Sequence, residues 1–142
     1  MHNRAIIHGC LVAIDDVGVL IVGDAGIGKT TVCLELERLG HNFIADDAVL
    51  IRRIYNEIIG SAPRETIGRV ARRGIGSLNR VPKGSELSCS IDLIVHLISN
   101  RETLPEMRTD EMLNAVPRQH FRIAESTARE IETFALKADR ES

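Results

Sequence analysis

The stretch "VGDAGIGKTT", residues 22–31, constrains what this chain can fold into more than any other feature of its 142 residues. It fits the pattern G-x-x-x-x-G-K-[ST], in which a glycine-rich loop points backbone N–H groups at phosphate oxygens. In this pattern Lys29 reaches the β- and γ-phosphates and the Thr30 hydroxyl binds Mg²⁺. The sequence therefore predicts ATP and Mg²⁺ as ligands. The residues expected to bind the nucleotide are Gly23, Asp24, Ala25, Gly26, Ile27, Gly28, Lys29, Thr30 and Thr31.

The residues on either side of this loop match the context that the pattern requires. "VGVLIV", residues 17–22, is a short apolar run typical of a buried strand. Over residues 29–39 the apolar side chains fall on one helical face, and Gly40 is placed to end the helix. A strand, a glycine loop and a helix are expected in this order, which makes a chance turn the weaker interpretation.

Further apolar runs indicate an α/β fold around this loop. Residues 5–14, "AIIHGCLVAI", are expected to form a strand that turns at Asp15 and Asp16 and pairs with residues 17–22. The other expected elements are strands at residues 43–45, 48–51, 56–63 (an edge strand ended by Pro63) and 90–99, and a helix near residues 124–138. We predict a single α/β domain over residues 1–142, with a mixed sheet in which an antiparallel strand precedes the strand of the glycine loop.

Two adjacent carboxylates, Asp46 and Asp47, follow the short run at residues 43–45. Neighbouring side chains at the end of a strand point to opposite sides, so the two are expected to have different roles. One is placed to face the phosphates as a metal ligand or general base, because the strand after a glycine-loop helix often ends beside them. The alternative is that both only end a strand in solvent, as expected for Asp15 and Asp16.

The histidines are less informative on their own. His8 lies within a strand pattern, where a single histidine is more often a packed core residue than a catalytic one. His41, His96 and His120 have no spacing typical of a metal or catalytic site, so we interpret them as structural.

A strongly basic segment covers residues 64–83, where six Arg or Lys residues face one acid, Glu65. Three glycines and Pro82 within it predict a loop. Such a loop could receive the acidic or phosphorylated surface of a partner, or it could only be solvated. It has no aromatic residue to stack on bases, which argues against binding of single-stranded nucleic acid.

Composition and cysteine usage narrow the location and the partners. The formal net charge of −2 gives no general attraction to nucleic acid or to anionic membranes. No apolar run approaches the ~18 residues of a membrane-spanning helix. Cys10, Cys33 and Cys89 lie far apart in the sequence without C-x-x-C spacing, which fits free thiols and neither a disulfide framework nor a zinc site. We therefore expect a cytoplasmic protein without nucleic-acid or membrane partners.

Taken together, four segments resemble one family. "IHG-x-LV", "GVLIVGDAGIGKTT", "LGHNFIADDAV" and "RRGIGSLNRV" occur in the order seen in HPr kinase/phosphorylase, bacterial enzymes that phosphorylate a serine of the carrier protein HPr and reverse the reaction. The resemblance covers roughly residues 3–98 and continues more faintly through "VPRQHFRIAESTAREIETFALK". It implies a fold related to phosphoenolpyruvate carboxykinase, a hexameric ring, and a short form that corresponds to the family's catalytic domain.

By position, the resemblance also implies roles for individual residues. His8 corresponds to the family's active-site histidine, and Lys29 and Thr30 to its phosphate- and Mg²⁺-binding residues. Asp47 corresponds to the proton acceptor, with Asp46 as its close support and a metal ligand.

The family's signature loop is only partly matched. Arg73, Gly74 and Gly76 correspond to residues that the family uses in both reaction directions. Ala71, however, stands where the family has a Mg²⁺-binding Glu, and Arg108 is the nearest candidate for a further catalytic Arg. The expected function is ATP-dependent phosphorylation of HPr or an HPr-like protein, with the reverse reaction. Two alternatives stay open: a kinase of a small metabolite, and a non-catalytic nucleotide-binding regulator, which Ala71 favours.

Overall fold

The computed structural model describes residues 3–63, 88–99 and 111–141. The basic segment at residues 64–83, with Ala71, Arg73 and the signature glycines, therefore lies outside the described residues, as does Arg108. In chain order the elements are β1 (Arg4–His8), β2 (Cys10–Ile14), β3 (Val17–Val22), α1 (Lys29–Arg38), β4 (Asn42–Ala45), β5 (Ala48–Ile54), β6 (Glu57–Ser61), β7 (Ser88–Ser90), β8 (Leu93–Ile98), the 3₁₀ helix η4 (Glu111–Leu113), β9 (Arg118–Arg122) and α3 (Thr127–Glu141).

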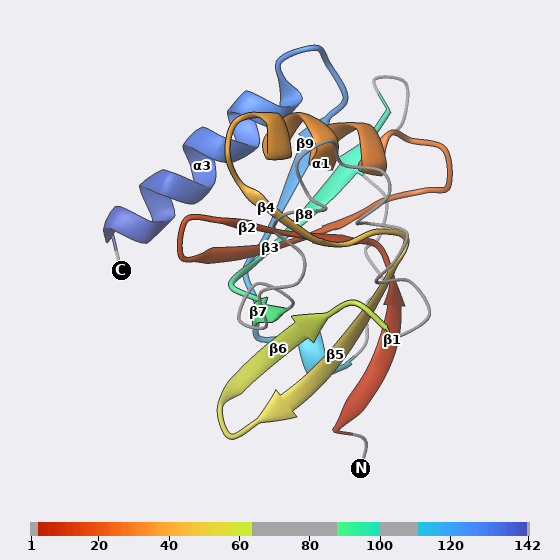
Figure 1. Ribbon diagram of the computed structural model, residues 1–142, viewed down its shortest axis with the longest axis vertical. Coiled ribbons are helices and arrows are strands. Elements are labelled where there is room, and N and C mark those ends of the chain that lie inside the picture. The colour runs from red at the N-terminus through yellow and green to blue at the C-terminus, as the bar shows by residue number, and fades with distance from the viewer. Residues whose placement is uncertain (1–2, 64–87, 100–110, 142) are drawn as a thin grey trace.

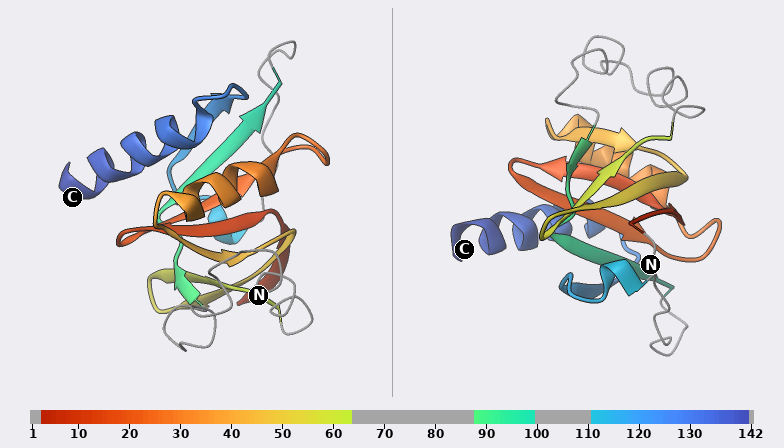
Figure 2. Two further views of the ribbon diagram at one scale, coloured as in Figure 1. Left: turned by 45° about the horizontal axis from the view of Figure 1, so that its top comes forward. Right: turned by 90° about the horizontal axis from the view of Figure 1, so that it is seen from below.

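These strands form two sheets and, with the helices, three layers. The five-stranded sheet has the order β4-β2-β3-β8-β9 and is mixed, because β2 is antiparallel to its neighbours whereas β3, β8 and β9 run parallel. The four-stranded sheet, β1-β5-β6-β7, is antiparallel throughout. Helices α1 and α3 cover one face of the five-stranded sheet, and the four-stranded sheet lies on its other side (Figures 1 and 2). The predicted mixed sheet, with an antiparallel strand before the strand of the glycine loop, is confirmed.

The central strands are buried on both faces, and their alternation builds two cores. Residues facing the helices pack with α1 and α3 in one cluster, which includes Cys10, Val12, Ile14, Val19, Ile21, Val95 and Leu97. Residues facing the other sheet belong to a second cluster, which includes Leu11, Leu20, Ile94, Val49, Ile51 and Leu113. Period-two alternation of this kind places successive side chains on opposite faces, so both layers are anchored to the same three strands.

The prediction of one continuous strand over residues 5–14 is wrong. Gly9 separates β1 from β2, and these strands belong to different sheets. A Cβ at Gly9 would lie 2.8 Å from the backbone oxygen of Ile21, so only glycine allows the chain to cross so close to β3. As a result His8 ends β1, and its side chain is 57% exposed; it is not the core residue that its position in the apolar pattern favoured.

The remaining predicted elements are present with small differences. The helix after the glycine loop runs from Lys29 to Arg38, and Gly40 follows it with φ 102°. The last helix begins at Thr127 and extends to residue 141. However, β6 is not an edge strand, because β7 pairs with its outer side. Within the described ranges, no helix combines the length and the apolar character needed to cross a membrane.

Candidate functional site

The topology brings three chain segments to one edge of the five-stranded sheet. Strands β3 and β4 both run toward this edge, and antiparallel β2 starts there between them. The glycine loop leaves the end of β3, and Asp46 and Asp47 follow the end of β4. The start of β2 pairs Cys10 with Ile21, directly beneath the loop. The predicted phosphate-binding and acidic segments are therefore neighbours in space, and Thr30 and Asp46, 16 residues apart in sequence, are in contact.

The glycine loop closes over the N-terminus of α1. Gly26 and Gly28 have φ values of 80° and 113°, which residues with a side chain rarely adopt. The backbone N–H of Ile27 donates to the Asp24 carbonyl at 3.1 Å and fixes the first turn of the loop. Since the first N–H groups of a helix have no partner within it, the loop and the start of α1 present donors suited to an anion.

Lys29 is the first residue of α1 and is 7% exposed. Its Nζ donates hydrogen bonds to the carbonyl oxygens of Gly23 at 2.9 Å and Asp24 at 3.0 Å. The ammonium group is thereby held against the loop rather than extended into solvent. It is a positive charge at the position where phosphate oxygens would enter.

Asp46 lies beneath the loop and is 3% exposed. Its Oδ1 accepts a hydrogen bond from Thr30 Oγ1 at 2.7 Å and a weaker one from the Cys10 thiol at 3.5 Å. The contact with Thr30 connects the β4–β5 connection to the first turn of α1. A hydroxyl and a carboxylate at this distance are a pair of oxygen ligands of the kind that Mg²⁺ prefers.

Asp47 points to another side of the chain. Its backbone is in the left-handed region, with φ 72°, and its side chain is 57% exposed. Oδ1 of Asp47 lies 3.5 Å from His8 Nδ1. The chain crosses between the two sheets from β1 to β2 at Gly9 and from β4 to β5 at Asp46 and Asp47. A hydrogen bond joins these two crossings, since the Gly9 N–H donates to the Asp47 carbonyl at 3.2 Å. His8 and Asp47 are therefore positioned together by the backbone of both crossings.

These groups surround a cavity of about 330 Å³. It is bounded on one side by the loop and on the other by His8 and Asp47. The lining residues are His8, Cys10, Ala25, Gly26, Gly28, Lys29, Thr30, Thr31 and Asp47. Of the predicted site residues, Gly23, Asp24, Ile27 and Asp46 are not among the lining residues, and Arg73 is outside the described residues.

Sequence reasoning missed Cys10, which contributes to the cavity and contacts Asp46. Only the pairing of β2 with both β3 and β4 places this residue under the loop. The Cys33 thiol donates a hydrogen bond to the Cys10 sulfur, which is the largest cause of a Cys10 pKa lowered to about 7. Burial opposes this shift, while the Asp47 backbone, Thr30 and the charge of Lys29 support it.

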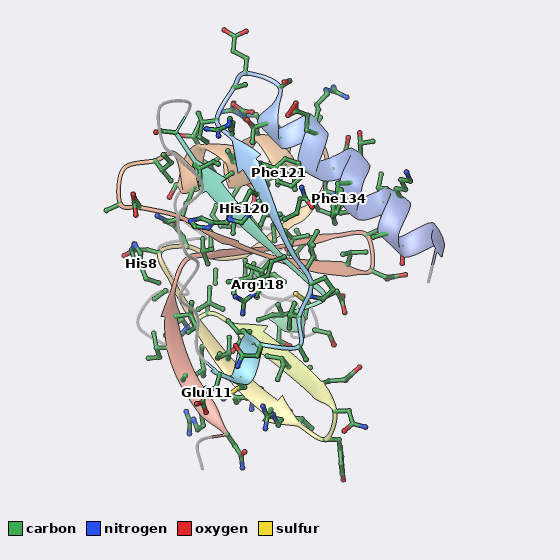
Figure 3. The ribbon with its side chains drawn as sticks, turned by 180° about the vertical axis from the view of Figure 1, so that it is seen from behind. His8, Glu111, Arg118, His120, Phe121 and Phe134 are labelled. Atoms are coloured by element: carbon green, nitrogen blue, oxygen red, sulfur yellow. The ribbon has the colours of Figure 1, made fainter. Side chains whose placement is uncertain are left out.

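The other histidines have structural surroundings, in agreement with their interpretation from sequence. Nε2 of His41 lies 2.6 Å from Glu132 Oε2, which connects the end of α1 to α3. The rings of His96 and His120 are 5.0 Å apart on neighbouring strands β8 and β9. His120 lies on β9, whereas His8 lies at the side of the molecule away from α3 (Figure 3).

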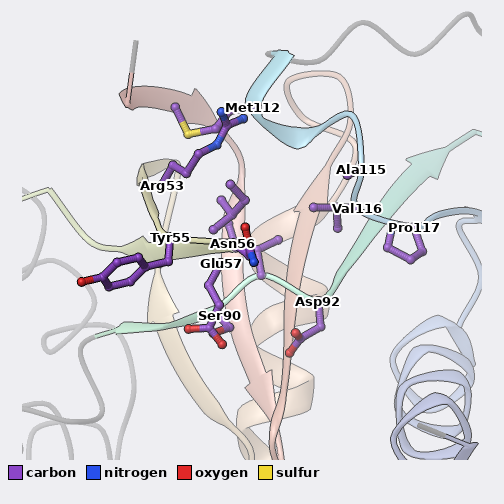
Figure 4. Close-up of a pocket in the computed structure, with 12 residues that line it drawn as sticks. Arg53, Tyr55, Asn56, Glu57, Ser90, Asp92, Met112, Ala115, Val116 and Pro117 are labelled. Atoms are coloured by element: carbon purple, nitrogen blue, oxygen red, sulfur yellow. The ribbon is translucent and has the colours of Figure 1, made fainter. Parts of the chain in front are cut away.

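A second cavity, of about 490 Å³, lies at the β5–β6 turn and contains none of the predicted site residues. Tyr55 and Asn56 of this turn form one wall, and Asp92 and Pro117 contribute to another (Figure 4). Burial raises the pKa of Asp92, an effect that the charges of Glu57 and Asp139 increase and a hydrogen bond from the Gly18 N–H opposes. This second cavity is larger than the one at the glycine loop, but it is not the better candidate for a nucleotide site, because no glycine loop or helix N-terminus lines it.

Comparison with known proteins gives consistent matches. Residues 1–132 match the family described as HPr Serine kinase C-terminal domain. The HPr kinase/phosphorylase of Malacoplasma penetrans is 36% identical over 118 residues, which are 80% of this chain and 38% of that protein. The HPr kinase/phosphorylase of Clostridium tetani is 43% identical over 96 residues, which are 64% of this chain and 31% of that protein. The chain thus spans less than two fifths of the length of these relatives.

A solved structure matches over almost the whole chain. The structure of the Hpr(Ser) kinase/phosphatase from Coxiella burnetii superposes with a TM-score of 0.75 and 26% sequence identity. The match covers 96% of this chain and 92% of that one. The two-sheet arrangement with its mixed α/β layers is therefore shared with that protein.

Proposed function

Because the chain belongs to the HPr serine kinase C-terminal domain family, we propose that it is an ATP-dependent protein kinase. Its acceptor is a serine hydroxyl of the phosphocarrier protein HPr or of an HPr-like protein. In the reverse direction it removes this phosphoryl group, with orthophosphate as the acceptor. We further propose that residues 1–142 form a single P-loop catalytic domain of the phosphoenolpyruvate carboxykinase-like type.

The observation that carries this proposal is that the two adjacent carboxylates, Asp46 and Asp47, lie in different surroundings. Asp46 is buried and bonded to Thr30, behind the phosphate-binding loop. Asp47 is exposed to the cavity beside His8. Phosphoryl transfer needs one group to hold charge at the phosphates and another to accept the proton of the attacking hydroxyl. The two residues supply these functions from one strand end.

In the forward reaction, the glycine loop and Lys29 bind and orient the phosphates of ATP. The serine oxygen attacks the γ-phosphorus in line with the leaving ADP oxygen, and Asp47 accepts the proton of the serine hydroxyl during this attack. His8, whose Nδ1 lies 3.5 Å from Asp47 Oδ1, positions that carboxylate. In the reverse reaction Asp47 returns the proton to the serine oxygen, because both directions cross the same transition state.

The residues present fit a Mg²⁺ ion. Thr30 Oγ1 and Asp46 Oδ1 are hard oxygen donors 2.7 Å apart, at the position where the loop meets the phosphates. Among the described residues, no cluster of three or more His, Cys, Asp or Glu could hold a metal. This agrees with an ion bound by one or two protein oxygens together with phosphate and water. When bound, Mg²⁺ neutralises charge on the β- and γ-phosphates.

Several finer features are part of the same proposal. A protein acceptor is favoured over a small metabolite by the basic segment at residues 64–83, since arginine and lysine suit an acidic or phosphorylated partner surface. We propose that the chain works as a cytoplasmic homo-oligomer, a hexamer by family resemblance. Regulation of carbohydrate metabolism through the phosphotransferase system follows if HPr is the acceptor.

The deciding experiment measures ATP turnover with purified HPr, without HPr, and with a serine-to-alanine HPr variant. We expect phosphate transfer only to the serine-bearing protein. ATP binding without transfer would instead support a nucleotide-binding regulator, a second candidate that Ala71 in the signature loop specifically favours. Turnover that is independent of HPr but stimulated by a small hydroxyl compound would identify a metabolite kinase.

A further inference from the structure

The four-stranded sheet carries apolar side chains on its outer face, which turns away from the five-stranded sheet. Strands β1, β5 and β6 lie side by side on the side of the molecule away from α1 and α3 (Figures 1 and 2). Alternation along these strands places Ile6, Leu50, Ile54 and Ile59 on the outer face. Ile6 is 64% exposed and Ile54 is 42% exposed. Because the solvent face of an antiparallel sheet is ordinarily polar, this apolar face is suited to contact a partner.

Two arginines lie on the same face without an acidic neighbour. Arg4 of β1 and Arg52 of β5 are directly opposite each other in the ladder, and Arg52 is opposite Ile59 of β6. Like charges at opposed positions destabilise a sheet, so this pair is unfavourable in the chain by itself. Within the part of the chain that the structure describes, neither arginine forms an ion pair, and Nε of Arg52 is buried without a hydrogen-bond partner. Both observations point to carboxylates supplied by a partner.

The outer face also leads to the proposed active site. His8 is the last residue of β1, and it shares this face with Arg4 and Ile6 because side chains two residues apart point to the same side of a strand. His8 lines the cavity at the glycine loop, and its Nδ1 lies 3.5 Å from Oδ1 of Asp47. At ~3.4 Å per residue, Arg4 lies about 14 Å from His8 along the strand. A protein bound on this face is therefore next to the proposed proton acceptor.

We propose that this face docks the protein that accepts the phosphoryl group, through an acidic segment that also carries aliphatic side chains. The identity of that protein as HPr or an HPr-like protein rests on the proposed function. The carboxylates of the segment pair with the two arginines, and its aliphatic side chains cover the exposed isoleucines. The residues of this docking face are Arg4, Ile6, Leu50, Arg52, Ile54 and Ile59.

Charge complementarity selects this occupant over a second copy of the chain or a membrane. A two-fold contact between copies would bring Arg4 and Arg52 of both copies into one desolvated interface, where arginines without partners are strongly unfavourable. An anionic membrane would attract the two arginines, but the net charge of −2 opposes its approach to the whole chain. An acidic segment neutralises both arginines, and the planar guanidinium groups match its carboxylates in geometry.

The test measures binding of purified HPr to the full chain by calorimetry, for the parent and three variants. Arg52→Glu reverses one charge of the docking face. It also turns the like-charged pair with Arg4 into an oppositely charged one, so the melting temperature should not fall. Ile6→Ser removes apolar surface only. Arg53→Glu is the matched control, because Arg53 is the next residue of β5 and belongs to the opposite face, beside the second cavity.

We expect Arg52→Glu to raise the dissociation constant for HPr at least ~10-fold, since a negative charge then faces the acidic segment. Binding by the parent should weaken as NaCl is raised, and binding by Arg52→Glu should depend less on NaCl. Ile6→Ser should weaken binding without changing its salt dependence, and Arg53→Glu should stay within about twofold of the parent. In the phosphorylation assay Arg52→Glu should raise the KM for HPr, with kcat and the dissociation constant for ATP unchanged.

Parental affinity for HPr in Arg52→Glu, an equal loss in Arg53→Glu, or no binding of HPr by the parent overturns the docking face. Two other results overturn it in favour of a different occupant, if HPr binding is unchanged. The first is a dimer of the parent that Arg52→Glu dissociates, and the second is binding to phosphatidylglycerol vesicles that Arg52→Glu abolishes. HPr that binds as expected but is not phosphorylated contradicts the proposed function alone. Phosphorylation with a KM that Arg52→Glu does not change contradicts the docking face alone, so the two failures are distinguishable.

Discussion

The Thr30 hydroxyl donates a 2.7 Å hydrogen bond to Oδ1 of Asp46 and so joins the first turn of α1 to the end of β4. Thr30 is partly exposed at the cavity, whereas Asp46 is buried behind it. A buried carboxylate bonded to a hydroxyl at the phosphate position is placed to act through that hydroxyl or through a cation held by both.

Asp46→Asn should remove the effect of Mg²⁺ on ATP binding while retaining metal-independent binding. Asparagine keeps an oxygen that can accept from Thr30 but lacks the charge that favours a divalent cation. We expect the stimulation of ATP affinity by Mg²⁺ to fall at least ~10-fold, corresponding to the loss of one charged ligand at roughly 1.5–3 kcal/mol. Calorimetry with ATP in the presence of Mg²⁺, and again in the presence of EDTA, measures the affinity for ATP with and without the metal. Asp47→Asn is the matched control, and an equal loss in that variant would contradict the assignment of the metal to Asp46.

Lys29→Ala should weaken ATP binding at least ~10-fold with or without Mg²⁺, because a charge-assisted phosphate contact of roughly 1.5–3 kcal/mol is lost. The two carbonyls that now accept from Nζ belong to the loop itself, so the change is expected to loosen residues 23–24 and leave the sheets folded. Thermal unfolding and calorimetry on the same samples separate these effects. Parental affinity in the variant would show that the loop does not bind phosphate through this lysine.

Asp47→Asn should reduce phosphorylation of HPr and its reversal together, by about 10²–10⁴, with little change in ATP affinity. Asn retains the shape of the side chain but cannot carry the proton that passes between serine and enzyme. His8→Gln should reduce both rates less, because it removes only the neighbour at 3.5 Å. Both reactions are assayed with the same variant preparations. A loss confined to one direction is incompatible with a shared proton acceptor.

The local features of this site could be predicted from sequence because they depend on short-range rules. The glycine loop, the helix from Lys29 and the turn at Asp15 each follow from residues close in the chain. Strand geometry predicted that Asp46 and Asp47 face different sides, although both residues follow the end of β4 and Asp47 has φ 72°. Their partners, Thr30 and His8, are set by how β4 and β1 join their sheets.

What escaped prediction depends on contacts between distant segments. The apolar alternation runs through His8, Gly9 and Cys10 without a break, and only the close approach of Gly9 to Ile21 reveals the change of sheet. Strand β7 consists of Ser-Cys-Ser, which has no apolar pattern, and it exists through pairing with β6. The meeting of Cys10 and Cys33 likewise needs the packing of α1 on β2.

The contact of His41 with Glu132 should stabilise the packing of α1 against α3. Nε2 and Oε2 are 2.6 Å apart, and the side chains are only 9% and 19% exposed, so solvent screens the pair weakly. We expect His41→Leu and Glu132→Leu each to lower the free energy of unfolding by about 1–3 kcal/mol. In urea denaturation the double variant should lose less than the sum, with a coupling of ~0.5–3 kcal/mol. Glu130→Ala, which removes an exposed contact with Ser126, is the control and should change the free energy of unfolding less than either substitution of the buried pair. Simple additivity of the two buried substitutions would contradict a direct interaction between His41 and Glu132.

Asp92→Asn should stabilise the protein at neutral pH and lose this advantage as the pH falls. Burial, assisted by the charges of Glu57 and Asp139, raises the Asp92 pKa above its ordinary 3.8. The folded state therefore binds this proton more tightly than the unfolded state does. The resulting stabilisation is fully present below pH 3.8 and is lost as the pH rises through the raised pKa. Above that pKa the parent keeps a partly desolvated charge, whereas Asn is neutral and its oxygen can still accept from the Gly18 N–H.

Melting temperatures measured at several pH values between 4 and 8 test this prediction for Asp92. The melting temperature of Asp92→Asn should exceed that of the parent at pH 7 to 8, and this difference should decline toward pH 4. Glu125→Gln removes the same charge from a position outside the second cavity, which Asp92 lines, and should show no such trend. Asp92→Ala also loses the acceptor for the Gly18 N–H and should be less stable than Asp92→Asn throughout. A difference between Asp92→Asn and the parent that is constant over this range would mean that Asp92 titrates alike in the folded and unfolded chain.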